Sequence, residues 1–401
     1  MTSTSPTRRR LIAATAAGLV ATRFPAAALA RDGTPSPTGG DDGSLPEMLA
    51  RAYDPIVDGG LGPSTLVSYA NIARQLEVHG LRSLDPPVAD EDRFSEWADG
   101  VDGLFVDDVL LTFTRTQELW DTLGFGPADV TQSMVLGDPP ETTRIYRGSF
   151  DGARIRASLA AFGFERVEIE HGAVLTIGRE GEIDLRGGIM SSVLNAYNNI
   201  AVVDDAYVVA CPYLVDLEAA LTVLAGNGAT LAANRAVDTL LTAVGEELVS
   251  ATIIDGGGLS VANMPDLGPL GASTPVPAGT IAPAAYALFG ITPGSMPSRY
   301  TDEDNQLQGD NDDTAPRSAF VVALHLGSSR EAEAAVPVIE GRLAEGVSLL
   351  DGRAYADLLG PATVAAVAGA PVVKIRFTGD RVGRNWLRAL LSRDLVFVYT
   401  E

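Results

Sequence analysis

Short apolar runs that come in pairs, with only a turn between them, restrict the fold of this chain more than any other feature. Residues 199–211, N-I-A-V-V-D-D-A-Y-V-V-A-C, hold two such runs, with Asp204 and Asp205 at the turn. Residues 166–177, R-V-E-I-E-H-G-A-V-L-T-I, hold another pair. Runs joined this closely pair antiparallel, because parallel strands need a crossover of about a dozen residues or more. The chain is therefore expected to build a mainly antiparallel sheet.

Helical segments alternate with these hairpins. The segment from Asp151 to Gly163 places Ile155 and Leu159 at helical spacing, with a residue suited to the N-cap at its start and a glycine at its end. Residues 215–226 have the same character. This alternation predicts the α+β class, with helices on one face of the sheet, rather than a doubly wound parallel sheet.

Two stretches of the chain resemble each other. Residues 228–241 and 346–359, which lie 118 positions apart, share a glycine, an arginine (Arg235 and Arg353) and two final leucines. Further upstream, A-Y-V-V-A at 206–210 matches A-F-V-V-A at 319–323. The preserved order predicts two divergent copies of one layered unit, and the alternative is chance similarity between helices rich in alanine and leucine. The two arginines either cover apolar surface with their stems or form the halves of a duplicated anion site.

The predicted organisation has five parts. They are an export signal at 1–30, a flexible linker at 31–44, a first α+β region at 45–260 with repeat unit 1 from about 144, a loop-rich connector with an acidic segment at 261–317, and a second α+β region, repeat unit 2, at 318–401.

The first thirty residues contain the three parts of an export signal. Arg8 and Arg9 belong to the positive region, an apolar stretch follows, and Ala28 and Ala30 form the small-residue cleavage site. The arginine pair with the apolar residues after it resembles the twin-arginine signal, and an ordinary secretion signal is the alternative. The protein is therefore expected to be secreted across the cytoplasmic membrane, to the periplasm, the cell-wall zone or the medium, and to meet a membrane only during export.

The net charge argues against one class of partner, and the cysteine content excludes internal disulfides. The formal net charge is −23, and removal of residues 1–30, which contain four arginines and no acids, would leave −27. So acidic a protein repels phosphate backbones, which argues against nucleic acid as a partner. Cys211 is the only cysteine, so the chain forms no internal disulfide, and its apolar surroundings predict a core residue rather than an activated thiol.

Motifs for catalysis are missing from the sequence. His79, His171 and His325 lack the H-x-x-H and H-E-x-x-H spacings of metal sites, and no G-x-S-x-G elbow occurs. The glycine-rich segments lack the spacing and the lysine of phosphate-binding loops. Each histidine is expected to be structural or solvent-exposed, and no cofactor is predicted.

One acidic stretch offers ligands for a hard cation. Asp302, Asp304, Asp310 and Asp312 are candidate Ca²⁺ ligands, although their spacing does not match an EF-hand loop. A solvated connector is the alternative interpretation of this stretch.

These observations favour a non-catalytic binding or interaction module whose partner is a small molecule or a protein. The alternative is an exported hydrolase whose active site is assembled from residues distant in sequence.

Export is expected to depend on the arginine pair. Replacing Arg8 and Arg9 together with lysine should strongly reduce the amount of protein found outside the cytoplasm, because the twin-arginine route requires both guanidinium groups. Immunoblotting of culture fractions measures this. Undiminished export of the double variant would remove the twin-arginine interpretation and leave the ordinary secretion signal.

Overall fold

The computed structural model describes residues 43–54, 66–81, 84, 91–101, 104, 120–138, 141–182, 195–263, 278–294, 317–350, 352–378, 384–392 and 394–401. The chain divides into two compact units, residues 1–41 and 42–401, and all of the described residues belong to the second.

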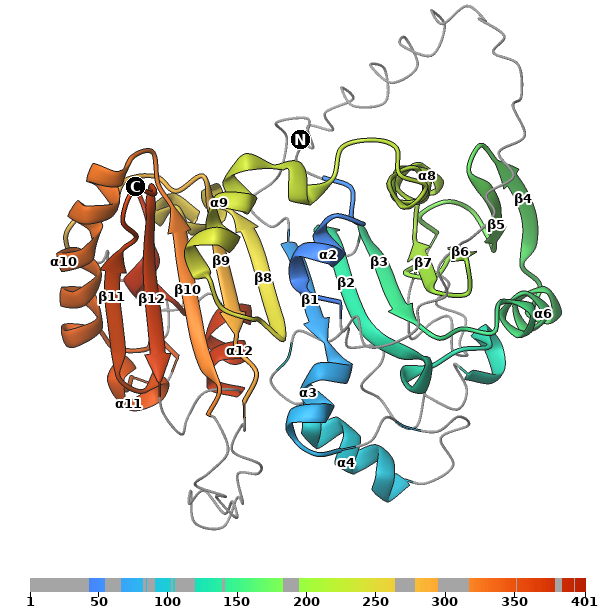
Figure 1. The fold of residues 1–401 in the computed structure, drawn as a ribbon, viewed down its shortest axis with the longest axis horizontal. Coiled ribbons are helices and arrows are strands. Elements are labelled where there is room, and N and C mark those ends of the chain that lie inside the picture. Colours follow the sequence, from blue (N-terminus) through green and yellow to red (C-terminus); the bar gives the residue numbers. More distant parts are fainter. Residues whose placement is uncertain are drawn as a thin grey trace, which may run out of the picture. The chain divides into compact units, whose positions relative to one another are not determined.

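A single twelve-stranded sheet runs through this second unit (Figure 1). Its strand order is β11-β12-β10-β9-β8-β1-β2-β3-β7-β6-β5-β4, and the pairs between neighbours are antiparallel. The strands are β1 (Leu66–Asn71), β2 (Val130–Asp138), β3 (Glu141–Gly148), β4 (Glu165–Ile169), β5 (Gly172–Thr176), β6 (Asn199–Val203), β7 (Tyr207–Cys211), β8 (Ser250–Asp255), β9 (Tyr286–Ile291), β10 (Ala319–His325), β11 (Ala362–Ala366) and β12 (Val372–Thr378). The predicted α+β class and antiparallel sheet are confirmed.

The turn between β6 and β7 is formed as the sequence predicts. Asp204 and Asp205 have φ values of 50° and 52°, and the N–H of Ala206 donates to the carbonyl of Val203 at 3.0 Å. Positive φ at both central residues is the mark of the type I′ turn, whose twist matches that of a two-stranded hairpin. Aspartate tolerates this left-handed conformation better than most residues, so the sequence specifies the turn locally.

The two halves of the sheet follow similar paths, although the first half has two more strands, β5 and β6, after its crossover helix. In one half, β1, β2 and β3 are adjacent, a helix (α6) crosses over, and the chain returns through β4 to β7, which lies beside β3. In the other half, β8, β9 and β10 are adjacent, α10 crosses over, and the chain returns through β11 to β12, which lies beside β10. The halves meet where β1 pairs with β8, so the two predicted regions and the strand β9 between them share one sheet.

Helices cover both faces of the sheet, so the expectation that they lie on one face is wrong. One face carries α2 (Leu45–Leu49), α8 (Leu214–Leu224) and α9 (Arg235–Val244). The other carries α3 (Ile72–Val78), α4 (Glu91–Val101), α6 (Gly152–Phe162), α10 (Ser329–Glu345), α11 (Tyr355–Leu359) and α12 (Arg384–Leu391). The central strands are apolar on both sides: in β10, Phe320 and Val322 are buried toward one layer and Val321 and Ala323 toward the other. A strand buried on both faces needs cover on both.

The two segments matched in the sequence occupy different places. Residues 235–244 form α9, which packs in the core that contains Val321, whereas residues 355–359 form α11, which packs in the core that contains Val208. The matched helices therefore lie on opposite faces, and the proposed correspondence between them is wrong. Alanine and leucine at helical spacing fit either face, so the match carries no information about position.

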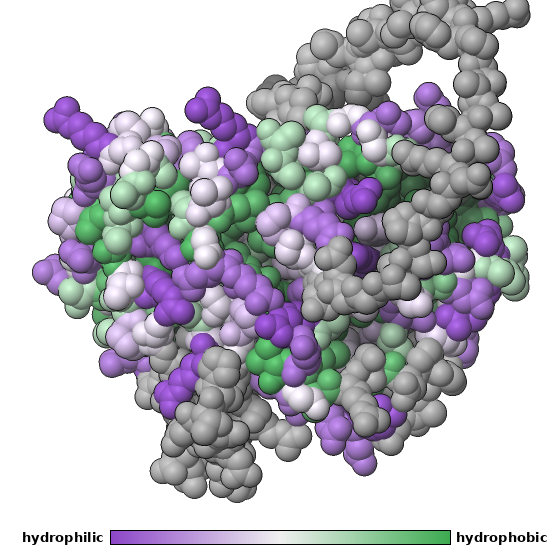
Figure 2. Space-filling view, viewed as in Figure 1, coloured by the Kyte–Doolittle hydropathy of each residue, from purple (hydrophilic) through white to green (hydrophobic). Residues whose placement is uncertain are grey.

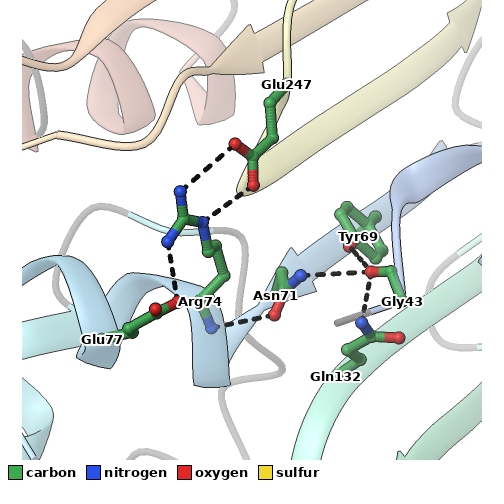
Figure 3. A network of polar contacts seen from close by, with 7 residues as sticks. All are labelled: Gly43, Tyr69, Asn71, Arg74, Glu77, Gln132 and Glu247. Atoms are coloured by element: carbon green, nitrogen blue, oxygen red, sulfur yellow. Dashed lines mark hydrogen bonds and ion pairs between the residues drawn. The ribbon is translucent and has the colours of Figure 1, made fainter. Parts of the chain in front are cut away.

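A polar network braces the joint between the halves (Figure 3). The carbonyl of Gly43 accepts hydrogen bonds from the Tyr69 hydroxyl at 3.0 Å, from Asn71 Nδ2 at 3.1 Å and from Gln132 Nε2. Asn71 also caps α3, because its Oδ1 accepts from the N–H of Arg74 at 3.0 Å. These contacts tie the start of the described chain to β1 and β2.

Arg74 extends this network to the other half of the sheet. Its Nε donates to Glu247 Oε1 at 2.9 Å, just before β8, and its Nη1 to Glu77 Oε2 at 2.7 Å (Figure 3). Both glutamates are well exposed, so the pairs are screened by water.

The surface mixes hydrophilic and hydrophobic residues over the described part of the view in Figure 2. No helix among the described residues combines the length and the apolar character needed to cross a bilayer.

We expect the buried part of the central network to stabilise the fold more than its exposed part. Asn71→Ala removes a helix cap and a buried donor, which should lower the free energy of unfolding by about 1–2 kcal/mol. Arg74→Ala removes exposed ion pairs and should cost less than about 1 kcal/mol. Urea denaturation followed by circular dichroism measures the free energy of unfolding of each variant. Equal decreases for Asn71→Ala and Arg74→Ala would contradict the prediction that the buried part contributes more.

Candidate functional site

Several candidates from the sequence lie outside the described residues. These are Arg8, Arg9, Ala28 and Ala30 of the signal, and Asp302, Asp304, Asp310 and Asp312 of the candidate Ca²⁺ segment. Within the part of the chain that the structure describes, no group of three or more His, Cys, Asp or Glu side chains is placed to hold a metal ion.

The three histidines lie on separate elements. His79 is the C-cap of α3 and its Nε2 lies 2.7 Å from Gln75 Nε2, His171 is in the turn between β4 and β5, and His325 ends β10. Burial lowers the pKa of His79 and of His325, which favours their neutral forms. No hydrogen bond among the described residues joins any of the three to a serine or a carboxylate.

Cys211 and the two matched arginines also have clear positions. Cys211 is buried in the core, and burial raises the pKa of its thiol to about 12, which keeps it protonated and unreactive. Arg235 and Arg353 are exposed near the starts of α9 and α11, on opposite faces of the sheet. The structure therefore does not bring the two arginines together at one anion site.

A small hollow lies between α11, α12 and the segment before α11, in the half of the sheet that contains β8 to β12. It measures about 290 Å³ out to open solvent, and its lining residues are Ser348, Leu350, Tyr355, Leu358, Leu359, Arg388, Ala389 and Asp394. That volume includes open solvent, and the enclosed space is only about 10 Å³, which is room for about one water molecule and far below the about 300–1,000 Å³ of small-molecule sites.

The polar floor of the hollow is a closed network. Asp394 is buried, and its carboxylate accepts from the Ser348 hydroxyl at 2.5 Å, the Tyr355 hydroxyl at 3.1 Å and the N–H groups of Leu349 and Leu350 at 2.9 and 3.3 Å. Burial, followed by the nearby Asp394 charge, raises the pKa of Tyr355, so the phenol stays protonated as a donor. This carboxylate is occupied in holding the loop and is not placed for acid–base chemistry.

The strand that follows α11 along the chain lies at an edge of the sheet. The chain passes from α11 through Gly360 and Pro361 into β11, the outermost strand of its half (Figure 1). None of the residues that line the hollow belongs to β11. We call the outward side of β11, which has no neighbouring strand among the described residues, the β11 surface.

The backbone of β11 offers unpaired hydrogen-bonding groups. The N–H of Val367 donates to Val372 at 2.8 Å and the N–H of Thr378 donates to Pro361 at 3.0 Å, so the odd-numbered residues face β12. Alternation then points the N–H and C=O groups of Ala362, Val364 and Ala366 away from the sheet. No described strand pairs with this side of β11.

The two edges of the sheet differ in charge. At one edge, β4 exposes Glu165, Arg166 and Glu168, and the last two form an ion pair at 2.7 Å. Charged side chains of this kind discourage pairing with another chain. At the other edge, β11 has the sequence A-T-V-A-A, without a charge. Of the two edges, β11 is the one open to a further strand.

β11 was not predicted from the sequence. The available signal was a run of seven uncharged residues between Pro361 and Gly369, which is compatible with a strand and bounded by residues that interrupt one. Four of the seven are alanine, which is uncommon in strands, so the run gave only a weak strand signal.

Comparison with known proteins adds little to this picture. No protein-family model matches the chain, and no curated protein matches it in sequence. One solved structure, described as crystal form IV of TP0453, aligns over 86% of this chain and 98% of its own length, with 11% sequence identity and a TM-score of 0.35.

We expect Asp394 to hold the floor of the hollow. Asp394→Ala leaves two hydroxyls and two N–H groups without their acceptor and should lower the free energy of unfolding by about 3 kcal/mol. Tyr355→Phe removes one of four donors and should cost about 1 kcal/mol. Urea denaturation of both variants tests this ranking, which fails if Asp394→Ala costs no more than Tyr355→Phe.

Proposed function

We propose that this protein is an exported, non-catalytic interaction module that binds an extended segment of a partner protein at the β11 surface. The exposed, uncharged edge of β11 is the observation that carries the proposal. An extended peptide added to such an edge gains affinity from main-chain hydrogen bonds, and contacts of its alternate side chains give specificity.

The remaining features agree with this role. The signal-like N-terminus would deliver the module outside the cytoplasm, and the chain's negative charge keeps it away from nucleic acid. The buried carboxylate of Asp394 accepts hydrogen bonds from four donors within the fold, so the exposed edge is the better candidate for binding. We also propose that the halves that begin at β1 and β8 are the two related units, since three adjacent strands, a crossover helix and a return to the third strand occur in both.

Three synthetic peptides serve as probes for binding at β11. Each has seven residues with valine at positions 2, 4 and 6, and the other positions are all arginine, all serine or all glutamate. At least one peptide should slow the amide exchange of Ala362, Val364 and Ala366, whose N–H groups face outward, as measured by NMR.

Two substitutions of Val364 distinguish a peptide that pairs with the β11 edge from a peptide that binds elsewhere on the protein. Val364→Pro removes an outward N–H without breaking a bond to β12 and should abolish the protection. Val364→Thr keeps the N–H and the branched side chain and should retain it. The proposal fails if no peptide protects these amides or if protection persists in Val364→Pro.

A further inference from the structure

We propose that the segment bound at β11 is basic, with arginine or lysine at alternate positions, and that its basic side chains lie along α10. This inference rests on the proposed function and names the chemistry of its partner. Alternation is required because successive side chains of an added strand point to opposite faces of the sheet.

The orientation of α10 determines what such a strand would meet. Arg342 is turned inward, where its Nε and Nη2 donate to the carbonyls of Ala278 and Gly279 at 2.8 Å and its Nη1 to that of Tyr399 at 2.6 Å. Val338 faces the same loop, since a Cβ on Gly279 would lie 3.0 Å from its Cγ1. This flank of α10 therefore looks toward the middle of the sheet.

The opposite flank of α10 looks toward the edge. At about 100° per residue, Val336 and Leu343 project on the side of the helix away from Val338. Both are half-buried against the core to which Val364 of β11 also contributes, and α10 contacts β11. An added strand would find these two apolar side chains next to it.

Two carboxylates border the same flank. Glu333 and Glu340 are exposed and neighbour Val336 around the helix. Neither has an ion-pair partner among the described residues. They lie about 10 Å apart along the helix axis, and alternate residues of a strand lie about 7 Å apart, so two flexible side chains of one strand can each reach one carboxylate.

A long cationic side chain fits this surface better than any other kind. Its methylene stem would cover Val336 or Leu343, and its charged head would reach Glu333 or Glu340. The net charge of −23 favours approach of a basic segment over longer distances.

The face of β11 that points away from α10 determines which side chains of the bound segment lie on each side of the sheet. Thr363 and Ala365 lie opposite Arg376 and Lys374 of β12, and these two cations share one carboxylate, Glu246, at 3.1 and 2.6 Å. The surplus positive charge disfavours a basic side chain on this face. Small uncharged residues of the segment should therefore point here, and the basic residues toward α10.

The three peptides described above test this inference. The arginine peptide should bind more tightly than the serine peptide, and the glutamate peptide most weakly, as measured by fluorescence anisotropy at low ionic strength. Glu333→Gln with Glu340→Gln should weaken the arginine peptide about fivefold and leave the serine peptide unchanged, as expected for two exposed ion pairs.

A matched control keeps the change in net charge constant. Glu218→Gln with Glu345→Gln removes two exposed carboxylates away from this flank and from both sheet edges, and should leave the arginine peptide's affinity within twofold of the native value. The inference is overturned if the two double variants behave alike, or if the serine or glutamate peptide binds at least as tightly as the arginine peptide. If Val364→Pro still abolishes binding in that case, the proposed function stands and only the basic chemistry falls.

Discussion

The pairing of β1 with β8 joins strands that lie far apart in the sequence, since Ser68 faces Thr252 across it with 3.4 Å between their hydroxyl oxygens. The other strands of the sheet follow on either side of this pair, first β2 and β3 in one half, and β9 and β10 in the other. Because so much chain separates the partners, local preferences cannot specify their pairing. The polar network around Gly43, Asn71 and Arg74 stabilises this pairing. The hydrogen bond from Asn71 to Gly43 is buried, whereas the ion pair of Arg74 is exposed and weakened by water.

An open sheet has two edge strands, and in this sheet the two edge strands differ in the charge of their side chains. Charged side chains on β4 keep another strand away, whereas β11 presents only alanine, threonine and valine. A closed barrel would have no such strand to offer. The open edge is thus a consequence of the architecture, and its uncharged composition makes it available for binding.

Two buried charged residues, Arg342 and Asp394, hold parts of the chain together. Arg342 joins α10 to a loop and to the C-terminal segment, and Asp394 gathers a loop and a tyrosine. Groups engaged in this way cannot be withdrawn for chemistry without loss of stability. At the surface, by contrast, the outward side of β11 has no neighbouring strand among the described residues, and the carboxylates of Glu333 and Glu340 on α10 are exposed.

The sequence by itself determined the local elements. The turn at Asp204 and Asp205 and the ends of α6, from Asp151 to Gly163, were predictable because turn and cap hydrogen bonds join residues only a few positions apart. Burial of Cys211 followed from the apolar strand around it. Only the tertiary structure decided the strand order, the face that each helix covers and the exposure of β11. Those depend on long-range pairing and on the path of each connection, which is why the similar segments at Arg235 and Arg353 came to lie on opposite faces.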